Sequence, residues 1–112
     1  MTFEAYDIVT VPFPFTDALM HKRRPALVLS NQKAFNTPSG HSVMAMITSA
    51  ENTPWPLDTP ITDLEIAGLP APSVIRMKLF TLDHRFVISK RGSLSGHDVK
   101  AVRRALKNLL GF

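Results

Sequence analysis

Short apolar runs alternate with clusters of turn-forming residues over most of the chain, and this pattern predicts β-strands. β-branched and aromatic residues are frequent in these runs, as is typical of strands that pack against a core. The pattern predicts strands at residues 6–11, 25–30, 41–48, 73–82 and 86–89.

Prolines and glycines mark the connections between the predicted strands. Pro12-Phe13-Pro14-Phe15 is expected to end the first strand, because two prolines in three residues disrupt a β-ladder, and residues 13–22 then form a loop. Pro54-Trp55-Pro56 excludes a helix from residues 51–58 and predicts an exposed loop or sheet edge there. Further turns are predicted at residues 31–36, which favour a helical turn, at 37–40 and at 68–72.

The C-terminal stretch has helical periodicity instead. Ser95 followed by Asp98 matches a capping box, so a helix is expected from Gly96 to Leu110, with Gly111 ending it. Its apolar face, through which the helix should pack, contains Val99, Val102, Leu106, Leu109 and Leu110. The basic face, with Lys100, Arg103, Arg104 and Lys107, is either solvated or docks an acidic partner.

Several short strands followed by one helix predict a mainly β fold with one C-terminal helix (α+β), built as a small, strongly bent β-barrel. At 112 residues the chain is expected to form a single domain, residues 1–112.

The amino-acid composition excludes several kinds of catalytic and metal-binding site. The chain has no cysteine, which excludes disulfides, thiolate catalysis and cysteine-based zinc sites and fits a reducing compartment. No signal peptide and no membrane span is expected from the sequence, so the cytoplasm is the expected location. The formal net charge of +4 permits a nucleic-acid partner without requiring one.

The most suggestive polar motif is Lys22-Arg23-Arg24-Pro25, which directly precedes the apolar run 26–29. Arg24 precedes a proline, which favours an extended backbone and would hold its guanidinium at the mouth of a buried strand. A guanidinium stays charged and offers forked donors that suit a phosphate or a developing oxyanion. The alternative is that Arg23 and Arg24 are solvated side chains flanking a core strand.

Thr48 and Ser49 end the next predicted strand and would meet Arg24 if the two strands pair as a hairpin. The loop before the arginines would bring Thr16 and Asp17 close to the same place. Such a set of a cation and hydroxyls can bind a phosphodiester. Trp55, the only tryptophan, is either a partly buried anchor or a platform on which an RNA base stacks.

RNA carries its own nucleophile, the 2′-hydroxyl, so a protein can cleave it by alignment and charge stabilisation alone. No metal site and no cofactor is expected, because Asp7 and Asp17 are isolated and Asp58, Asp63 and Glu65 lie along a loop without a partner histidine. Cleavage would then leave a 2′,3′-cyclic phosphate and a 5′-hydroxyl.

An ordered series of short motifs, running almost end to end, resembles the MazF/PemK-like toxin family. The motifs are Asp7-Ile8-Val9, Pro12-Phe13-Pro14-Phe15-Thr16-Asp17, Arg23-Arg24-Pro25-Ala26-Leu27-Val28-Leu29-Ser30, Ile47-Thr48-Ser49, Ala67-Gly68-Leu69, Pro72-Ser73-Val74-Ile75-Arg76, Leu79-Phe80-Thr81-Leu82-Asp83 and Gly92-Ser93-Leu94-Ser95.

This resemblance implies an SH3-like barrel of the MazF/PemK/CcdB type. It further implies a homodimeric, metal-independent, sequence-specific endoribonuclease (an mRNA interferase) that acts on single-stranded RNA. A cognate antitoxin with an acidic, partly disordered tail would inhibit it. In the family, the catalytic pair is the arginine directly before the proline and a threonine ending the following strand. These positions correspond to Arg24 and Thr48, with Arg23, Thr16, Asp17, Ser49 and Trp55 as the expected substrate contacts.

Two positions depart from the family pattern. Tyr6 stands where the family usually has glycine before Asp-Ile-Val, and Met20-His21 replaces small residues in the loop that gates RNA access. The alternative function is binding without cleavage, as a gyrase poison like the related CcdB toxins or as an inactive member that only binds an antitoxin. The pair Arg24 and Thr48 favours cleavage, because a pure binder does not need it.

Overall fold

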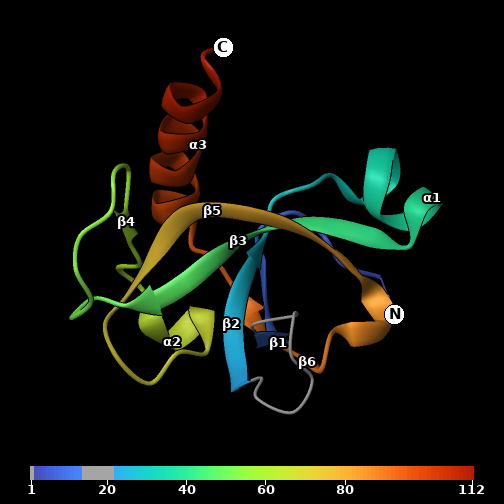
Figure 1. Cartoon of the computed structure of the whole chain (residues 1–112), viewed down its shortest axis with the longest axis horizontal. Helices are drawn as coiled ribbons and strands as arrows, with labels where there is room; N and C mark the ends of the chain where they lie inside the picture. The colour runs from blue at the N-terminus through green and yellow to red at the C-terminus, as the bar shows by residue number, and fades with distance from the viewer. Residues whose placement is uncertain (1, 14–21) are drawn as a thin grey trace.

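The computed structural model describes residues 2–13 and 22–112, which form one curled antiparallel sheet with a C-terminal helix (Figure 1). Within these residues the sheet has six strands in the order β4-β5-β3-β2-β1-β6. Their bounds are β1 Asp7–Phe13, β2 Lys22–Val28, β3 His41–Ser49, β4 Thr59–Pro60, β5 Ser73–Asp83 and β6 Ser89–Ser93. Thr16, Asp17 and Met20-His21 lie outside the described residues. The predicted mainly β fold with one C-terminal helix is confirmed.

The helical elements are short except for the last. They are the π-helical turn η1 Gln32–Asn36, α1 Thr37–Ser39, α2 Leu64–Ala67, the 3₁₀ turn η2 His84–Phe86 and α3 Gly96–Leu110. No helix within residues 2–13 and 22–112 is long and apolar enough to cross a membrane.

β3 and β5 form where they were predicted, but β1 does not end at Pro12. It continues to Phe13, with Pro12 opposite Arg23 of β2. The prediction of a break was wrong because β6 pairs with β1 only as far as Thr10. Thr10 faces β6, as its carbonyl accepts a bond from the Ile88 N–H at 2.8 Å, and Pro12 has the same orientation two residues later. The missing N–H of Pro12 therefore falls on a side without a neighbouring strand.

The second and last strands are displaced from their predicted positions. β2 begins at Lys22, three residues before the predicted start, so Arg24 lies inside the strand opposite Val11 rather than at its mouth. β6 begins at Ser89, where the predicted strand 86–89 ends. Asp83 causes this shift, because its side chain accepts a hydrogen bond from the Arg85 N–H at 2.9 Å and caps the turn η2.

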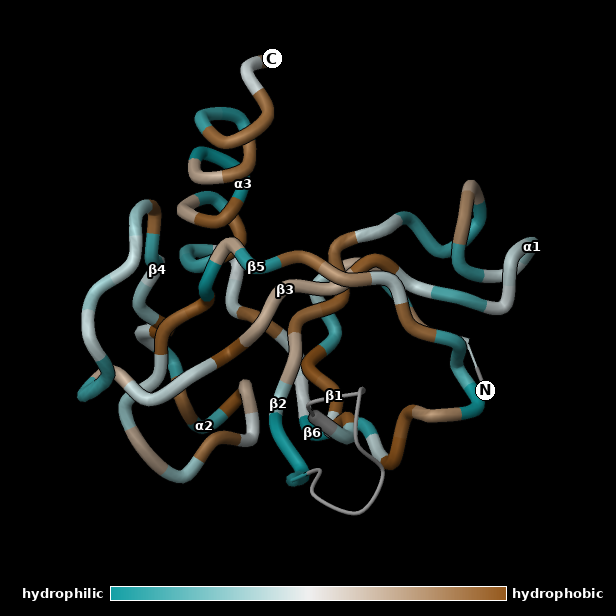
Figure 2. Tube along the Cα trace, in the orientation of Figure 1, coloured by the Kyte–Doolittle hydropathy of each residue, from teal (hydrophilic) through white to brown (hydrophobic). Residues whose placement is uncertain are grey.

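Buried side chains cover both faces of the central strands. One cluster, which includes Ile8, Leu27 and Ile47, packs against Val102 and Ala105 of α3. The other contains Phe3, Val9, Val11, Ala26, Val28, Met44 and Leu82. Figure 2 shows the consequence for β2, which starts hydrophilic and turns hydrophobic towards its end. The curled sheet thus leaves the basic start of β2 at its rim.

α3 spans the predicted residues, and Ser95 caps it by accepting a hydrogen bond from the Asp98 N–H at 3.2 Å. The Asp98 carboxylate accepts from the Thr62 N–H and hydroxyl at 2.9 and 2.8 Å. Burial by itself raises the pKa of Asp98, but the hydrogen bonds from Thr62, Asp63 and Ser95 lower it below its ordinary value. Asp98 therefore fastens the start of the helix to the segment after β4.

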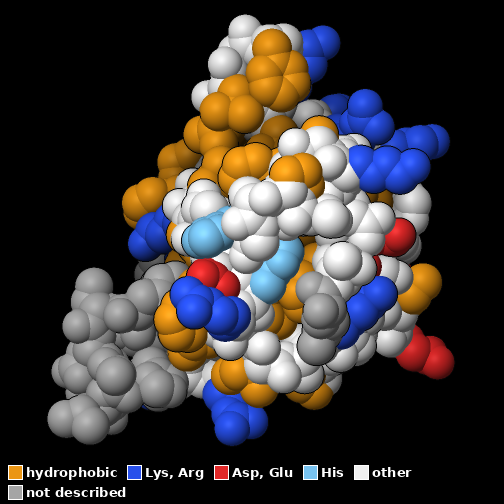
Figure 3. Space-filling model, turned by 90° about the vertical axis from the view of Figure 1, so that its right-hand side faces the viewer, with side chains coloured by type: hydrophobic (Ala, Val, Ile, Leu, Met, Phe, Trp, Pro, Cys, Tyr) orange, Lys and Arg blue, Asp and Glu red, His pale blue; other side chains and the backbone are white. Residues whose placement is uncertain are grey.

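The last turn of α3 does not pack as predicted. Leu109 and Leu110 are 40% and 58% exposed, because the helix extends past the sheet (Figure 1). Hydrophobic side chains gather along this protruding end (Figure 3).

α2 was not predicted, and its contact with β6 is unusually close. A Cβ atom on Gly68 would lie 2.3 Å from the Arg91 carbonyl oxygen, and one on Gly92 would lie 2.3 Å from that of Ile66. Only glycines allow the two backbones to approach this far. The contact places the segment that follows α2 beside β6.

Tyr6 adopts the left-handed backbone conformation, with φ of 73°. Its N–H donates to the Val28 carbonyl at 2.7 Å and its carbonyl accepts from the Leu94 N–H at 3.0 Å, so this conformation is held on both sides. Residues with a side chain rarely adopt it, which explains why glycine suits this position. The tyrosine side chain packs against the α3-side core cluster instead.

We expect Tyr6→Gly to be more stable than Tyr6→Ala by about 1 kcal/mol in the free energy of unfolding. Both variants lose the ring, so the comparison isolates the strain of a Cβ at positive φ. Denaturant titration of the two proteins measures this difference. Equal stabilities would show that the position carries no such strain.

Candidate active site

The pairing of β2 with β3 brings Arg24 and Thr48 together. Ala26 lies opposite Met46 and Leu27 opposite Ala45. Continuing this register by two residues places Arg24 across from Thr48, on the same face of the sheet. β2 and β3 therefore pair as the antiparallel hairpin on which the predicted contact of Arg24 with Thr48 depends.

Both residues line one pocket with a volume of about 220 Å³. Its walls come from β2, from the end of β3, from the segment after α2, from the start of β5 and from β6. The lining residues are Arg24, Pro25, Ile47, Thr48, Ser49, Leu69, Pro70, Ala71, Pro72, Ser73 and Arg91. The lining therefore combines two guanidinium groups and three hydroxyls with an apolar wall, and its described residues include no carboxylate and no imidazole.

Arg24 is half-buried, and its Nε is buried with no hydrogen-bond partner within residues 2–13 and 22–112. A buried donor that stays unpaired costs free energy, so such a group is suited to an acceptor that binds later. No acidic side chain of the described chain forms an ion pair with Arg24. Its charge is thus available to an anion in the pocket.

Thr48 and Ser49 present their hydroxyls in different settings. Thr48 is only 6% exposed, and its Oγ1 accepts a hydrogen bond from Asn52 Nδ2 at 2.6 Å. Ser49 is exposed, and its Oγ accepts from the Glu51 N–H at 3.2 Å. In both cases the oxygen accepts a hydrogen bond from an N–H group of the following loop, which leaves the hydroxyl's own proton to be donated elsewhere.

Arg91 is a second cation in the pocket that sequence reasoning did not identify. Its Nε donates to the Gly68 carbonyl at 3.1 Å and its Nη1 to the Thr10 hydroxyl at 3.5 Å. Position along the chain does not indicate this role, because Arg91 reaches the pocket through the close contact of β6 with α2. The sequence feature that bears on this contact is the presence of glycine at both Gly68 and Gly92.

Among the described residues, the remaining predicted substrate contacts, Arg23 and Trp55, lie outside the lining of this pocket. Arg23 is exposed and pairs across from Pro12. Trp55 is 43% exposed, with Lys78 Nζ 4.5 Å and Arg76 Cζ 5.9 Å from its ring centroid. The ring is therefore partly covered, with cations over it, and both predicted roles, partly buried anchor and stacking platform, stay open. Thr16 and Asp17 fall outside the described residues.

Arg76 holds the loop that carries Trp55. Its guanidinium pairs with Asp58 through Nε at 3.2 Å and Nη2 at 2.9 Å, and Nη2 also donates to the Thr53 carbonyl at 2.8 Å. Burial raises the pKa of Asp58, but its hydrogen bonds with Arg76 and with the Trp55 N–H, together with the charge of Arg76, outweigh this, so the pKa lies below its ordinary value. The carboxylate is therefore engaged in the loop.

No group of three or more His, Asp or Glu side chains within the described ranges is arranged to hold a metal ion. Asp58 pairs with Arg76, and Asp63 caps α2 by accepting from the Ile66 N–H at 3.2 Å. Asp58 and Asp63 thus both have structural partners.

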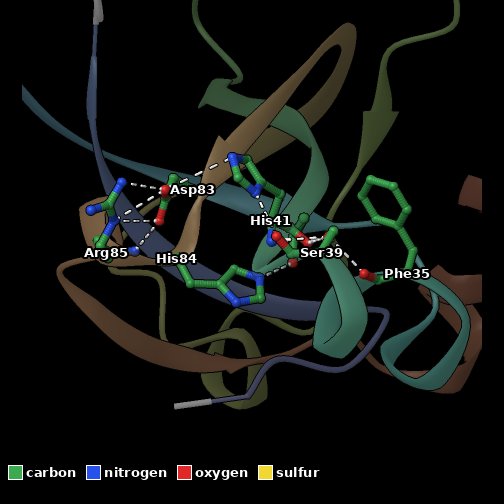
Figure 4. Close-up of polar contacts among 7 residues, drawn as sticks. Phe35, Ser39, His41, Asp83, His84 and Arg85 are labelled. Atoms are coloured by element: carbon green, nitrogen blue, oxygen red, sulfur yellow. Dashed lines mark hydrogen bonds and ion pairs between the residues drawn. The ribbon is translucent and has the colours of Figure 1, made fainter.

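A second polar cluster lies at the opposite end of β3 and β5, where His41 faces Asp83 (Figure 4). Arg85 donates to the Asp83 carboxylate and lowers its pKa to about 2, while His41 Nε2 lies 3.8 Å from it. His84 contacts the buried Ser42 hydroxyl at 2.7 Å, and burial lowers the pKa of His84. These contacts join η2 to β3, away from the pocket.

The fold matches solved structures along nearly the whole chain. MazF from Deinococcus radiodurans is 24% identical, with 100% of this chain and 99% of that chain covered and a TM-score of 0.77. An endoribonuclease in complex with its cognate antitoxin from a mycobacterial species is 16% identical, with 99% and 95% covered and a TM-score of 0.75. Mycobacterium tuberculosis toxin MazF-mt6 is 20% identical, with 95% and 97% covered and a TM-score of 0.74.

A comparison with curated protein sequences finds no match. The model of the PemK-like, MazF-like toxins of type II toxin–antitoxin systems, in contrast, matches residues 4–110. With the curled six-stranded sheet and the C-terminal helix, this match shows that the chain belongs to the PemK-like, MazF-like toxin family.

Proposed function

We propose that this toxin is an endoribonuclease that cleaves single-stranded RNA, including messenger RNA, at specific sequences and without a metal ion. The observation that carries the proposal is the meeting of Arg24 and Thr48 in one pocket, with a buried guanidinium donor of Arg24 that has no hydrogen-bond partner among the described residues. A phosphodiester supplies the acceptors that this donor lacks.

The reaction is attack of the 2′-hydroxyl on the neighbouring phosphorus. The 2′-oxygen forms a bond to phosphorus and the 5′-oxygen leaves with a proton, which gives a 2′,3′-cyclic phosphate and a 5′-hydroxyl. Negative charge collects on the non-bridging oxygens in the transition state. Arg24 stabilises this charge, Thr48 donates a hydrogen bond to one of the oxygens, and Arg91 adds a second cation.

Substrate binding extends beyond the pocket. We assign Ser49 to a neighbouring phosphate or sugar because it lines the pocket, and Arg23 to longer-range attraction because it is exposed at the rim. Trp55, which is 43% exposed, is the proposed platform for a base, and Thr16 and Asp17 are proposed contacts from the loop before β2.

The proposed partners are a second copy of the toxin and a cognate antitoxin with an acidic, partly disordered tail, with the cytoplasm as the place of action. A solved neighbour is an endoribonuclease in complex with its antitoxin, which supports such a partner here. The net charge of +4 favours association with an acidic segment.

Arg24→Ala should reduce the cleavage rate by roughly 10²-fold or more while the protein stays folded. The fold tolerates the change because the Arg24 Nε makes no hydrogen bond within the described chain. Initial rates on a labelled single-stranded RNA, with thermal unfolding alongside, measure both effects. Arg23→Ala is the matched control and should weaken binding in a salt-dependent way only. A wild-type rate for Arg24→Ala would remove Arg24 from the site.

Thr48→Val keeps the β-branched shape in a buried strand position and removes the hydroxyl. We expect a folded protein whose cleavage rate falls by about 10- to 100-fold, because a hydrogen bond to a charged oxygen is lost. The same rate assay and a melting curve test this. If the variant melts early but cleaves normally, Thr48 is only a strand residue.

An RNA with one 2′-methoxy sugar at the cut site should bind but remain uncut, since its nucleophile is blocked. Unmodified RNA should be cut equally well in a chelator and should yield the cyclic phosphate, detectable by mass spectrometry. Cleavage of the blocked RNA, or activity that requires added magnesium, would instead indicate a metal nuclease. Binding of RNA without any cleavage would favour the inactive, antitoxin-binding alternative.

A further inference from the structure

Asn52 makes the shortest side-chain contact to the candidate catalytic hydroxyl. Its Nδ2 donates to Thr48 Oγ1 at 2.6 Å, and Thr48 itself is only 6% exposed. Asn52 comes from the loop after β3 and does not line the pocket that contains Arg24. Its link to the site therefore runs through Thr48.

The direction of this hydrogen bond matters because a hydroxyl has one proton and two acceptor positions. When the Asn52 amide donates to Oγ1, it occupies one lone pair and turns the hydroxyl proton away from the loop. Among the described residues, the Thr48 hydroxyl has no acceptor for that proton. It is therefore free to be donated into the pocket, where a phosphate oxygen would accept it. The reverse amide orientation would present Oδ1 to Thr48 and capture the same proton.

The backbone around Asn52 is fastened at several points. The Ala50 N–H donates to the Pro72 carbonyl at 3.0 Å, and the Asn52 N–H donates to the Ser49 carbonyl at 3.1 Å. One residue further, the Thr53 carbonyl accepts from Arg76, which is 9% exposed and paired with Asp58. The side chain of Asn52 is thus presented to Thr48 from a held loop, although the residue itself is exposed.

We propose that Asn52 is a positioning residue that orients the Thr48 hydroxyl, so that its proton points at the phosphate to be cleaved. This inference rests on the proposed endoribonuclease function. It assigns Asn52 no contact with the RNA. Its effect should therefore appear in kcat rather than in KM, and should vanish when the Thr48 hydroxyl is absent.

Two substitutions at Asn52 separate orientation from simple loss of a contact. Asn52→Asp keeps the shape of the side chain but offers only acceptors. It should therefore accept the hydrogen bond of the Thr48 hydroxyl and lower kcat by about 10- to 100-fold. Asn52→Ala leaves the Thr48 hydroxyl free to rotate and should lower kcat less than Asn52→Asp does. The new negative charge of Asn52→Asp also repels RNA. The matched control is Thr53→Asp, which adds the same charge one residue along. This control should raise KM without lowering kcat.

The decisive measurement is a double-mutant cycle with Thr48→Val. If Asn52 acts through Thr48, Asn52→Asp should change kcat little in the Thr48→Val background. A loss that is equally large in both backgrounds would overturn the proposal. A pH profile adds a second readout, because protonation of the new carboxyl restores a donor. The activity of Asn52→Asp relative to wild type should rise as the pH falls towards the ordinary carboxyl pKa of about 4.

A third measurement does not depend on cleavage. One side-chain amide proton of Asn52 should shift in the NMR spectrum of Thr48→Val, because its acceptor is gone. An unchanged amide would overturn the positioning role even in an active enzyme. A folded wild-type protein that shows the shift but cleaves no RNA would overturn the proposed function and leave the hydrogen bond itself established.

Discussion

The antiparallel pairing of β2 with β3 is the interaction on which the candidate site depends. It places the arginine that precedes Pro25 across from the threonine near the end of β3. A shift of this register by one residue would turn every side chain of β2 to the other face of the sheet. Ala26 and Val28 would then leave their core cluster and Leu27 would leave the other, so the burial of these residues also fixes the geometry of the pocket.

The distribution of charge partners distinguishes the pocket from the rest of the surface. Asp7 pairs with Lys90, Asp58 with Arg76 and Asp83 with Arg85, which links neighbouring segments of the chain. Within the described chain, in contrast, the lining of the pocket has two guanidinium groups and no acid. Cations that have no acidic partner among the described residues create, in a partly buried site, a local attraction for anions that the modest net charge alone does not provide.

The candidate site, which is the pocket together with the residue that contacts Thr48, is assembled from elements that are held in place to different degrees. Arg24 and Thr48 stand on central strands that are packed on both faces, whereas Arg91 depends on the glycine contact between α2 and β6. Asn52 depends on a loop held by Arg76 and Asp58. Rigid strands thus carry the groups that would meet the phosphate, and loops supply the groups that orient them.

Local sequence signals were sufficient for much of the fold and for the central pair of the site. The capping residue Ser95 and the helical periodicity predicted α3, and the apolar runs predicted β3 and β5, because these features act over a few residues. They also pointed to Arg24 and Thr48. Only the tertiary structure decided that β1 passes through Pro12, since this depends on where β6 stops. It also decided that Arg91 reaches the pocket and that Asn52 meets the Thr48 hydroxyl. Contacts between residues distant in the chain are set by how strands and loops pack together, and no local pattern encodes that packing.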